Sequence, residues 1–111
     1  MDIKRGDIYL ADFSQGGKKA LKPVLVVQND MGNKYSGATI VVQLPDFLTE
    51  KLLPTHVAIP AEASKLGRDT VALTENLATV DKNRMKKFIT RLSDEYMEEI
   101  DRALKISLSL D

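Results

Sequence analysis

The chain has 111 residues, with one histidine and no cysteine, which excludes disulfides, thiolate chemistry and the usual histidine/cysteine zinc sites. Its 43% hydrophobic and 29% charged residues indicate a single folded domain over residues 1–111 and exclude both disorder and a long membrane-spanning run. Sixteen basic residues balance sixteen acidic ones, so overall charge gives no support for bulk binding to nucleic acid.

Charged residues interrupt the N-terminal segment MDIKRGDIYLADF, where a signal peptide needs an unbroken apolar core. We therefore expect a cytosolic protein, and the RGD tripeptide at residues 5–7 is then a poor candidate for an adhesion motif.

Further along, short runs rich in β-branched residues and separated by Gly, Asn, Pro and Ser predict strands. The expected strands cover residues 7–13, 23–28, 38–44, 55–60 and 70–80, and a sixth follows one helical turn at 87–92.

The last stretch of the chain is predicted to be a helix that begins after Ser93, with acidic residues in its first turn. Its apolar residues repeat at spacings of three and four, which is typical of a helix with one buried face. They are Met97, Ile100, Leu104 and Leu108. This stripe is interpreted as core or dimer interface, because the acidic polar side of the helix does not suit a membrane.

The order of elements predicts a mainly β fold: a strongly curved, mostly antiparallel sheet or small barrel closed by the C-terminal helix. Two long polar loops, at residues 14–23 and 29–37, are expected to emerge near one another at one end. Basic residues gather between 82 and 91, directly before the acidic helix. This pattern fits either two solvated faces, which we favour, or a phosphate-binding strip.

Read from the residues alone, no group of side chains identifies a reaction. His56 lies on a predicted strand, where a lone histidine more often makes structural hydrogen bonds than acts as a base. Glu75 and Asn76 interrupt a strand pattern, which indicates either a bulge beside a cleft or an exposed strand end.

Taken together, the segments KRGDIYLADF, KPVLVVQND, ATIVV, LPTHV, TVALTEN, TVDKNRM and ALKISLSL follow one another as in a known family. In this order and spacing the chain resembles the MazF/PemK toxins of type II toxin–antitoxin systems from end to end. The resemblance implies a small SH3-like curved antiparallel β-barrel of the CcdB/PemK type, a homodimer and a cognate antitoxin. It also implies a metal-independent endoribonuclease that cuts single-stranded RNA with no cofactor.

The family's functional positions are matched one by one. Lys22, before Pro23, stands where the family usually has an arginine at the scissile phosphate, and Pro45 stands where it usually has Thr or Ser. Ala78 replaces a further arginine, and the first loop has lost a glutamate. Because lysine offers a mobile point charge instead of a rigid bidentate fork, the change at Lys22 is not conservative.

Cleavage by the RNA 2′-hydroxyl needs a base, donors to the phosphoryl oxygens and an acid. Lys22 and Glu75 are the predicted catalytic residues. The predicted RNA-binding residues are Gln15, Lys18, Lys19, Gln43 and Asn76. Thr49 joins Gln43 and Gln15 as a candidate for the missing hydroxyl, while Tyr35 and Phe47 are placed in loops where an aromatic ring stacks on a base or simply anchors the loop.

Three functions remain open at this point. The first is an endoribonuclease toxin whose site is weakened or altered, and the second is a non-catalytic homologue that binds RNA or antitoxin without cleaving. The third, poisoning of DNA gyrase as by CcdB toxins, is less favoured because the ALKISLSLD end resembles a core helix of the MazF type.

Overall fold

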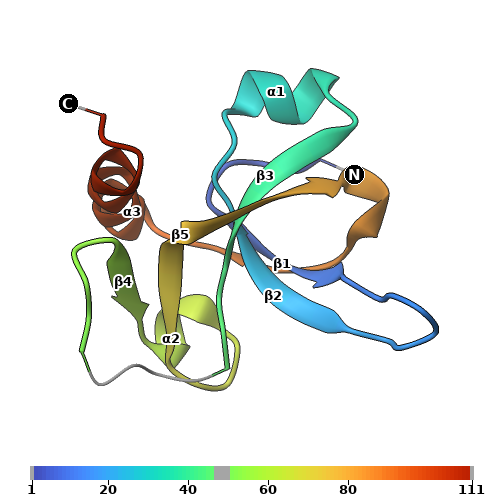
Figure 1. Ribbon diagram of the computed structural model, residues 1–111, viewed down its shortest axis with the longest axis horizontal. Coiled ribbons are helices and arrows are strands. Elements are labelled where there is room, and N and C mark those ends of the chain that lie inside the picture. The colour runs from blue at the N-terminus through green and yellow to red at the C-terminus, as the bar shows by residue number, and fades with distance from the viewer. Residues whose placement is uncertain (1, 47–50, 111) are drawn as a thin grey trace.

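The computed structural model describes residues 2–46 and 51–110, and its main feature is one six-stranded antiparallel sheet (Figure 1). The spatial order of the strands is β4-β5-β3-β2-β1-β6. Their bounds are β1 Asp7–Asp12, β2 Leu21–Val26, β3 Ala38–Gln43, β4 His56–Ile59, β5 Thr70–Asp81 and β6 Met85–Arg91. The six predicted strands are thus confirmed, with boundaries that shift by one or two residues.

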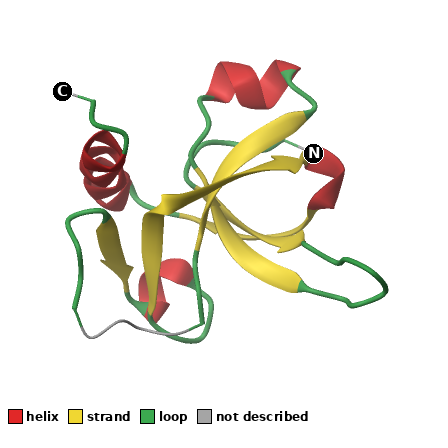
Figure 2. Ribbon diagram, viewed as in Figure 1, coloured by secondary structure: helices red, strands yellow, loops and turns green. Residues whose placement is uncertain are grey.

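The sheet curls into an open half-barrel, with β4 and β6 as its edges, and the helix α3 (Asp94–Ser107) lies beside it (Figure 2). The predicted fold class, a curved antiparallel sheet with a C-terminal helix, is confirmed. The pairing of β3 with β5 jumps from Leu77 opposite Val42 to Leu73 opposite Gln43. Residues 74–76 therefore bulge from the ladder, which is the interruption that the sequence pattern indicated.

The second half of strand β2, residues 24–26, is buried on both of its faces, which explains the apolar run there. Leu25 packs in one core with Ile8, Val42 and Ile100, on the side that faces α3. Val24 and Val26 pack in a second core, which includes Val41 and Met85. The first residues of the strand, Leu21 and Lys22, are exposed, so the chain passes from solvent to the interior within a single strand.

Two short helices were not expected from the sequence. Helix α1 (Asp30–Tyr35) lies inside the predicted second loop and begins at Asn29, whose side-chain oxygen accepts from the Gly32 N–H. Helix α2 (Ala61–Ser64) follows β4. The expectation that the two long loops lie at one end is wrong, because they flank opposite ends of β2, as Figure 1 shows.

Helix α3 buries the first half of its predicted stripe. Met97 and Ile100 enter the core and Leu104 packs against it, but Leu108 follows the last turn and is half exposed. Ser93 holds the expected N-cap position, although its side chain makes no capping hydrogen bond. None of the helices in the described ranges has the length and apolar character needed to cross a membrane.

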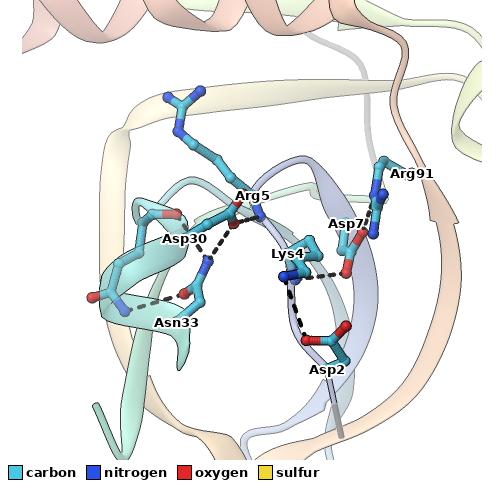
Figure 3. Close-up of polar contacts among 8 residues, drawn as sticks. Asp2, Lys4, Arg5, Asp7, Asp30, Asn33 and Arg91 are labelled. Atoms are coloured by element: carbon cyan, nitrogen blue, oxygen red, sulfur yellow. Dashed lines mark hydrogen bonds and ion pairs between the residues drawn. The ribbon is translucent and has the colours of Figure 1, made fainter. Parts of the chain in front are cut away.

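The turn at residues 4–7 is held by a polar network that includes both charged members of the RGD tripeptide (Figure 3). Arg5 donates from its Nε to the Val27 carbonyl at 2.8 Å and from Nη2 to Asp101 Oδ1 at 2.7 Å. Its backbone N–H donates to Asp30. Asp7, whose side chain is 1% exposed, accepts from Arg91 Nε at 2.7 Å. The tripeptide is therefore a structural turn.

Candidate functional site

A cavity of about 330 Å³ opens where β2 begins, β3 ends and the loop before β5 approaches them. Its position follows from the sheet, because the pairing of Val24 with Gln43 and the hydrogen bond from Leu44 N–H to the Pro23 carbonyl bring the two strand ends together. The lining residues are Leu21, Lys22, Pro23, Gln43, Leu44, Pro45, Asp46 and Arg68.

Three charged side chains of the described residues share this cavity: Lys22, Asp46 and Arg68. Within the described residues, none of the three makes a side-chain hydrogen bond or an ion pair. The two cations and one carboxylate among the described lining residues give one excess positive charge. Unpaired charges of this kind keep their donors and acceptors available for a ligand, and the excess favours an anion.

The two loops that carry Asp46 and Arg68 are joined to one another. Thr70, which is fully buried, donates from its hydroxyl to the Pro45 carbonyl at 2.7 Å. Asp69, which lies between Arg68 and Thr70 in the chain, accepts from the backbone N–H of Ala61 at 2.8 Å. Because Pro45, directly before Asp46, and Asp69 and Thr70, directly after Arg68, are hydrogen bonded, backbone contacts help to set the distance between the two loops.

The predicted catalytic pair is not brought together in this cavity. Lys22 lines it, but Glu75 belongs to the bulge of β5 and contacts other residues. Its Oε2 lies 2.8 Å from His56 Nε2, and its Oε1 accepts from the Thr55 hydroxyl at 3.0 Å. His56 Nδ1 in turn accepts from the Leu53 N–H, so the neutral ring carries its proton on Nε2 and donates it to Glu75.

The surroundings of Glu75 favour its charged form. Partial burial by itself raises the pKa of this carboxyl, but hydrogen bonds from His56, from its own backbone N–H and from Thr55 outweigh that effect. The net result is a pKa below the ordinary value of 4.5. The interpretation of His56 as a structural hydrogen-bonding residue agrees with these contacts.

Of the predicted RNA-binding residues, one lines the cavity and four lie elsewhere. Gln43 is on the cavity wall, whereas Asn76 is exposed in the bulge of β5. Gln15 and Lys18 pair across a two-glycine turn, and Lys19 follows them on the exposed loop. Gly16 and Gly17 have φ of 57° and 84°, as a tight hairpin turn of this type requires.

Gln15 also lines a second cavity, of about 360 Å³, between the segment after β1 and the end of β5. Phe13, Asp81 and Arg84 contribute to it as well. Arg84 donates to the Asp12 carbonyl at 3.0 Å, so part of its guanidinium is already occupied. Tyr35 lies in α1, at the end of β2 away from Lys22, while Thr49 and Phe47 lie outside the described residues.

The sequence reasoning missed Arg68 and Asp46. Arg68 is in an ordinary polar loop before β5, and nothing in its local pattern predicts that this loop reaches the start of β2. Asp46 directly follows Pro45, the position where the family usually has Thr or Ser. That neighbourhood could have indicated Asp46 as a site residue. The two other altered positions offer no polar side chain: Pro45 has only its backbone carbonyl, which accepts from Thr70, and Ala78 packs partly buried against the second core.

Comparisons with known proteins agree over nearly the whole chain. Residues 4–108 match the family described as PemK-like, MazF-like toxin of type II toxin–antitoxin system. The endoribonuclease MazF of Staphylococcus epidermidis is 46% identical over 112 residues, covering 98% of this chain and 93% of that protein.

Solved structures show the same fold. A mycobacterial endoribonuclease in complex with its cognate antitoxin is 25% identical, with a TM-score of 0.82 over 98% of this chain and 97% of that one. A chain of the MazE–MazF crystal structure from Deinococcus radiodurans is 18% identical, with a TM-score of 0.83 over 100% of both chains. At 18% identity, that second likeness shows the fold alone.

Proposed function

This chain belongs to the PemK-like, MazF-like toxins of type II toxin–antitoxin systems, and on that premise we propose that it is an endoribonuclease that cuts single-stranded RNA without a metal ion or other cofactor. The observation that carries the proposal is the cavity at the start of β2, where the unpaired Lys22 stands at the family's phosphate-binding position. The excess positive charge of the cavity suits a phosphodiester.

The reaction that suits this site is attack of the 2′-hydroxyl on the adjacent phosphorus. The phosphoryl oxygens gain negative charge in the transition state, so a cation held beside them lowers the barrier. Lys22 supplies such a cation, and its ammonium group also has a proton to give to the leaving 5′ oxygen. Gln43, on the same wall, offers an amide donor to the phosphate or to a base.

The alternative is a homologue that binds RNA or an antitoxin without cleaving. Pro45 and Ala78 favour it, because neither provides the side-chain donor that the family usually has there. Losing one oxyanion donor typically lowers a rate about a hundred- to a thousandfold. Effects of residues in one site do not simply add, so these two absences alone do not decide between the two functions.

The partners we propose are a cognate antitoxin and a second copy of this chain. The antitoxin proposal is supported by the mycobacterial relative, which was solved in complex with its own antitoxin. For the homodimer, support comes from apolar side chains at the end of α3 that are half exposed in the isolated chain. They are Ile106, Leu108 and Leu110. A cytosolic location remains a prediction from the N-terminal sequence.

Incubation of the purified protein with a long single-stranded RNA in EDTA tests the proposal. We expect discrete fragments ending in a 2′,3′-cyclic phosphate, and we expect Lys22→Ala to abolish them. Lys65→Ala is the matched control, because it removes the same charge from an exposed position outside the cavity. Intact RNA at a large excess of protein, across many sequences, would favour the non-catalytic alternative.

A further inference from the structure

Asp46 is the only carboxylate among the described residues that line the Lys22 cavity. It comes directly after Pro45, the position at which the chain lacks a hydroxyl. Among the described residues its carboxylate has no hydrogen-bond or ion-pair partner. A base needs a free oxygen, and that oxygen must lie within reach of the proton it takes. Asp46 has a free oxygen, and it lines the cavity where the substrate phosphate is proposed to sit.

Glu75, the carboxylate predicted from the sequence, has no oxygen that is free in this way. Both of its oxygens are engaged, one by Thr55 and the other by His56. These contacts also lower its pKa, which makes it a weaker base. In the folded chain Glu75 is therefore a partner for His56, and Asp46 is the carboxylate with a free acceptor.

Arg68 supplies what Lys22 lacks. A guanidinium presents a rigid fork to two phosphate oxygens, whereas an ammonium is a mobile point charge. Arg68 is half buried on the cavity wall and has no partner among the described residues. The hydrogen bond from Thr70 to the Pro45 carbonyl joins its loop to the loop of Asp46.

We propose that Asp46 is the general base and Arg68 the phosphate-holding cation of this site, in place of the family groups that the chain lacks. The inference rests on the proposed endoribonuclease function. Asp46 takes the proton of the 2′-hydroxyl as the O2′–P bond forms, and Arg68 donates to the non-bridging oxygens. The P–O5′ bond then breaks, and the 5′ oxygen takes a proton from Lys22. Lys22 then regains a proton from solvent, and Asp46 releases to solvent the proton that it took.

The role of Asp46 is tested with Asp46→Asn on an RNA oligonucleotide that carries a cleavage site mapped on the long RNA. We expect kcat to fall about a hundred- to ten-thousandfold, with little change in KM. The acidic limb of the pH profile of kcat should also disappear. Glu62→Gln, an exposed carboxylate on α2 outside the cavity, is the matched control and should retain both the rate and the limb.

The role of Arg68 is tested by binding, with a short single-stranded DNA of mixed sequence that has no 2′-hydroxyl to react. Arg68→Gln should reduce the slope of log affinity against log salt by about 0.7, as expected for one lost phosphate contact. Arg68→Lys should restore that slope, and in RNA cleavage it should still be slow because the fork is missing. Lys65→Gln, from the same loop, should leave the slope unchanged.

The possible results distinguish a failure of the endoribonuclease function from a failure of the roles of Asp46 and Arg68. If the wild-type protein cleaves RNA and Asp46→Asn retains its rate and its acidic limb, the assignment of Asp46 is overturned while the endoribonuclease function stands. An Arg68→Gln variant with the wild-type salt slope overturns the assignment of Arg68. If the wild-type protein cleaves no RNA, the endoribonuclease function and the base role of Asp46 both fail. The slope of log affinity against log salt still tests whether Arg68 holds a phosphate. Equal urea midpoints for all variants confirm that each one folds.

Discussion

The N-terminal turn and the Lys22 cavity both carry several charged side chains, but they use them in opposite ways. In the turn, Arg5 reaches Asp101 and Arg91 reaches Asp7, each at 2.7 Å, as Figure 3 shows for the second pair. In the cavity, Lys22 and its two charged neighbours have no such partners among the described residues. Paired charges join elements of the fold, whereas unpaired ones remain available to a ligand.

The largest effect on stability is expected from breaking a charge pair in the N-terminal turn. Asp7→Asn removes a buried charge that accepts from Arg91 and from the Lys4 N–H, and should lower the free energy of unfolding by about 2 kcal/mol. The loss stays below that of a fully buried pair, because the Arg91 side chain is 56% exposed and can be solvated. Urea unfolding measures it.

Lys22→Gln is the matched change in the cavity. It also removes one charge, yet it breaks no interaction within the described residues, so its free energy of unfolding should stay within about 0.5 kcal/mol of the wild type. A loss equal to that of Asp7→Asn would mean that the lysine is a structural residue. The comparison between the two regions would then be wrong.

A smaller effect tests whether the cavity depends on the link between its loops. Thr70→Val removes a buried donor and leaves the Pro45 carbonyl unpaired, which should cost about 1 kcal/mol and also lower kcat for RNA cleavage. Thr74→Val is the matched control on the same strand, since its hydroxyl donates to the Thr55 carbonyl at 2.6 Å, outside the cavity. Equal losses of kcat in both variants would contradict a specific role for the link.

Much of the fold was predictable because local patterns determine it. The apolar run of β2, the bulge at residues 74–76 and the stripe of α3 are each visible in a few neighbouring residues. The short helices α1 and α2 were missed, because six and four residues are too few for a periodic pattern. The placing of the loops failed for a topological reason, since a loop before a strand and a loop after it lie at opposite ends.

The candidate site was predictable only in part. Lys22 was found through a motif, because the position before Pro23 is fixed by its neighbours in the chain. Arg68 is 46 residues away in sequence, and only the folded sheet brings it to the same cavity. Glu75 was predicted to act with Lys22, but the bulge of β5 directs its side chain to His56. Which charged side chains line one cavity depends on contacts between segments far apart in the chain, and no local sequence pattern predicts such contacts.

The smallest effect concerns Glu75 and pH. Its pKa is lower in the folded chain than the ordinary 4.5, so the folded state binds fewer protons near that pH. The stability that the carboxylate contributes is therefore complete above the ordinary pKa and is lost as the pH falls through the lower, folded value. Because its side chain is 42% exposed, solvent screening keeps this contribution below about 1 kcal/mol.

Urea unfolding of Glu75→Gln against the wild type measures this contribution at neutral pH and again well below pH 4.5. The difference in free energy of unfolding should be present at neutral pH and should vanish in acid, whereas Glu98→Gln, an exposed carboxylate without a described partner, should show no difference at either pH. RNA cleavage by Glu75→Gln should stay near the wild-type rate. A large loss of kcat would instead place Glu75 in the reaction and weaken the case for Asp46, because one site needs only one base for the 2′-hydroxyl.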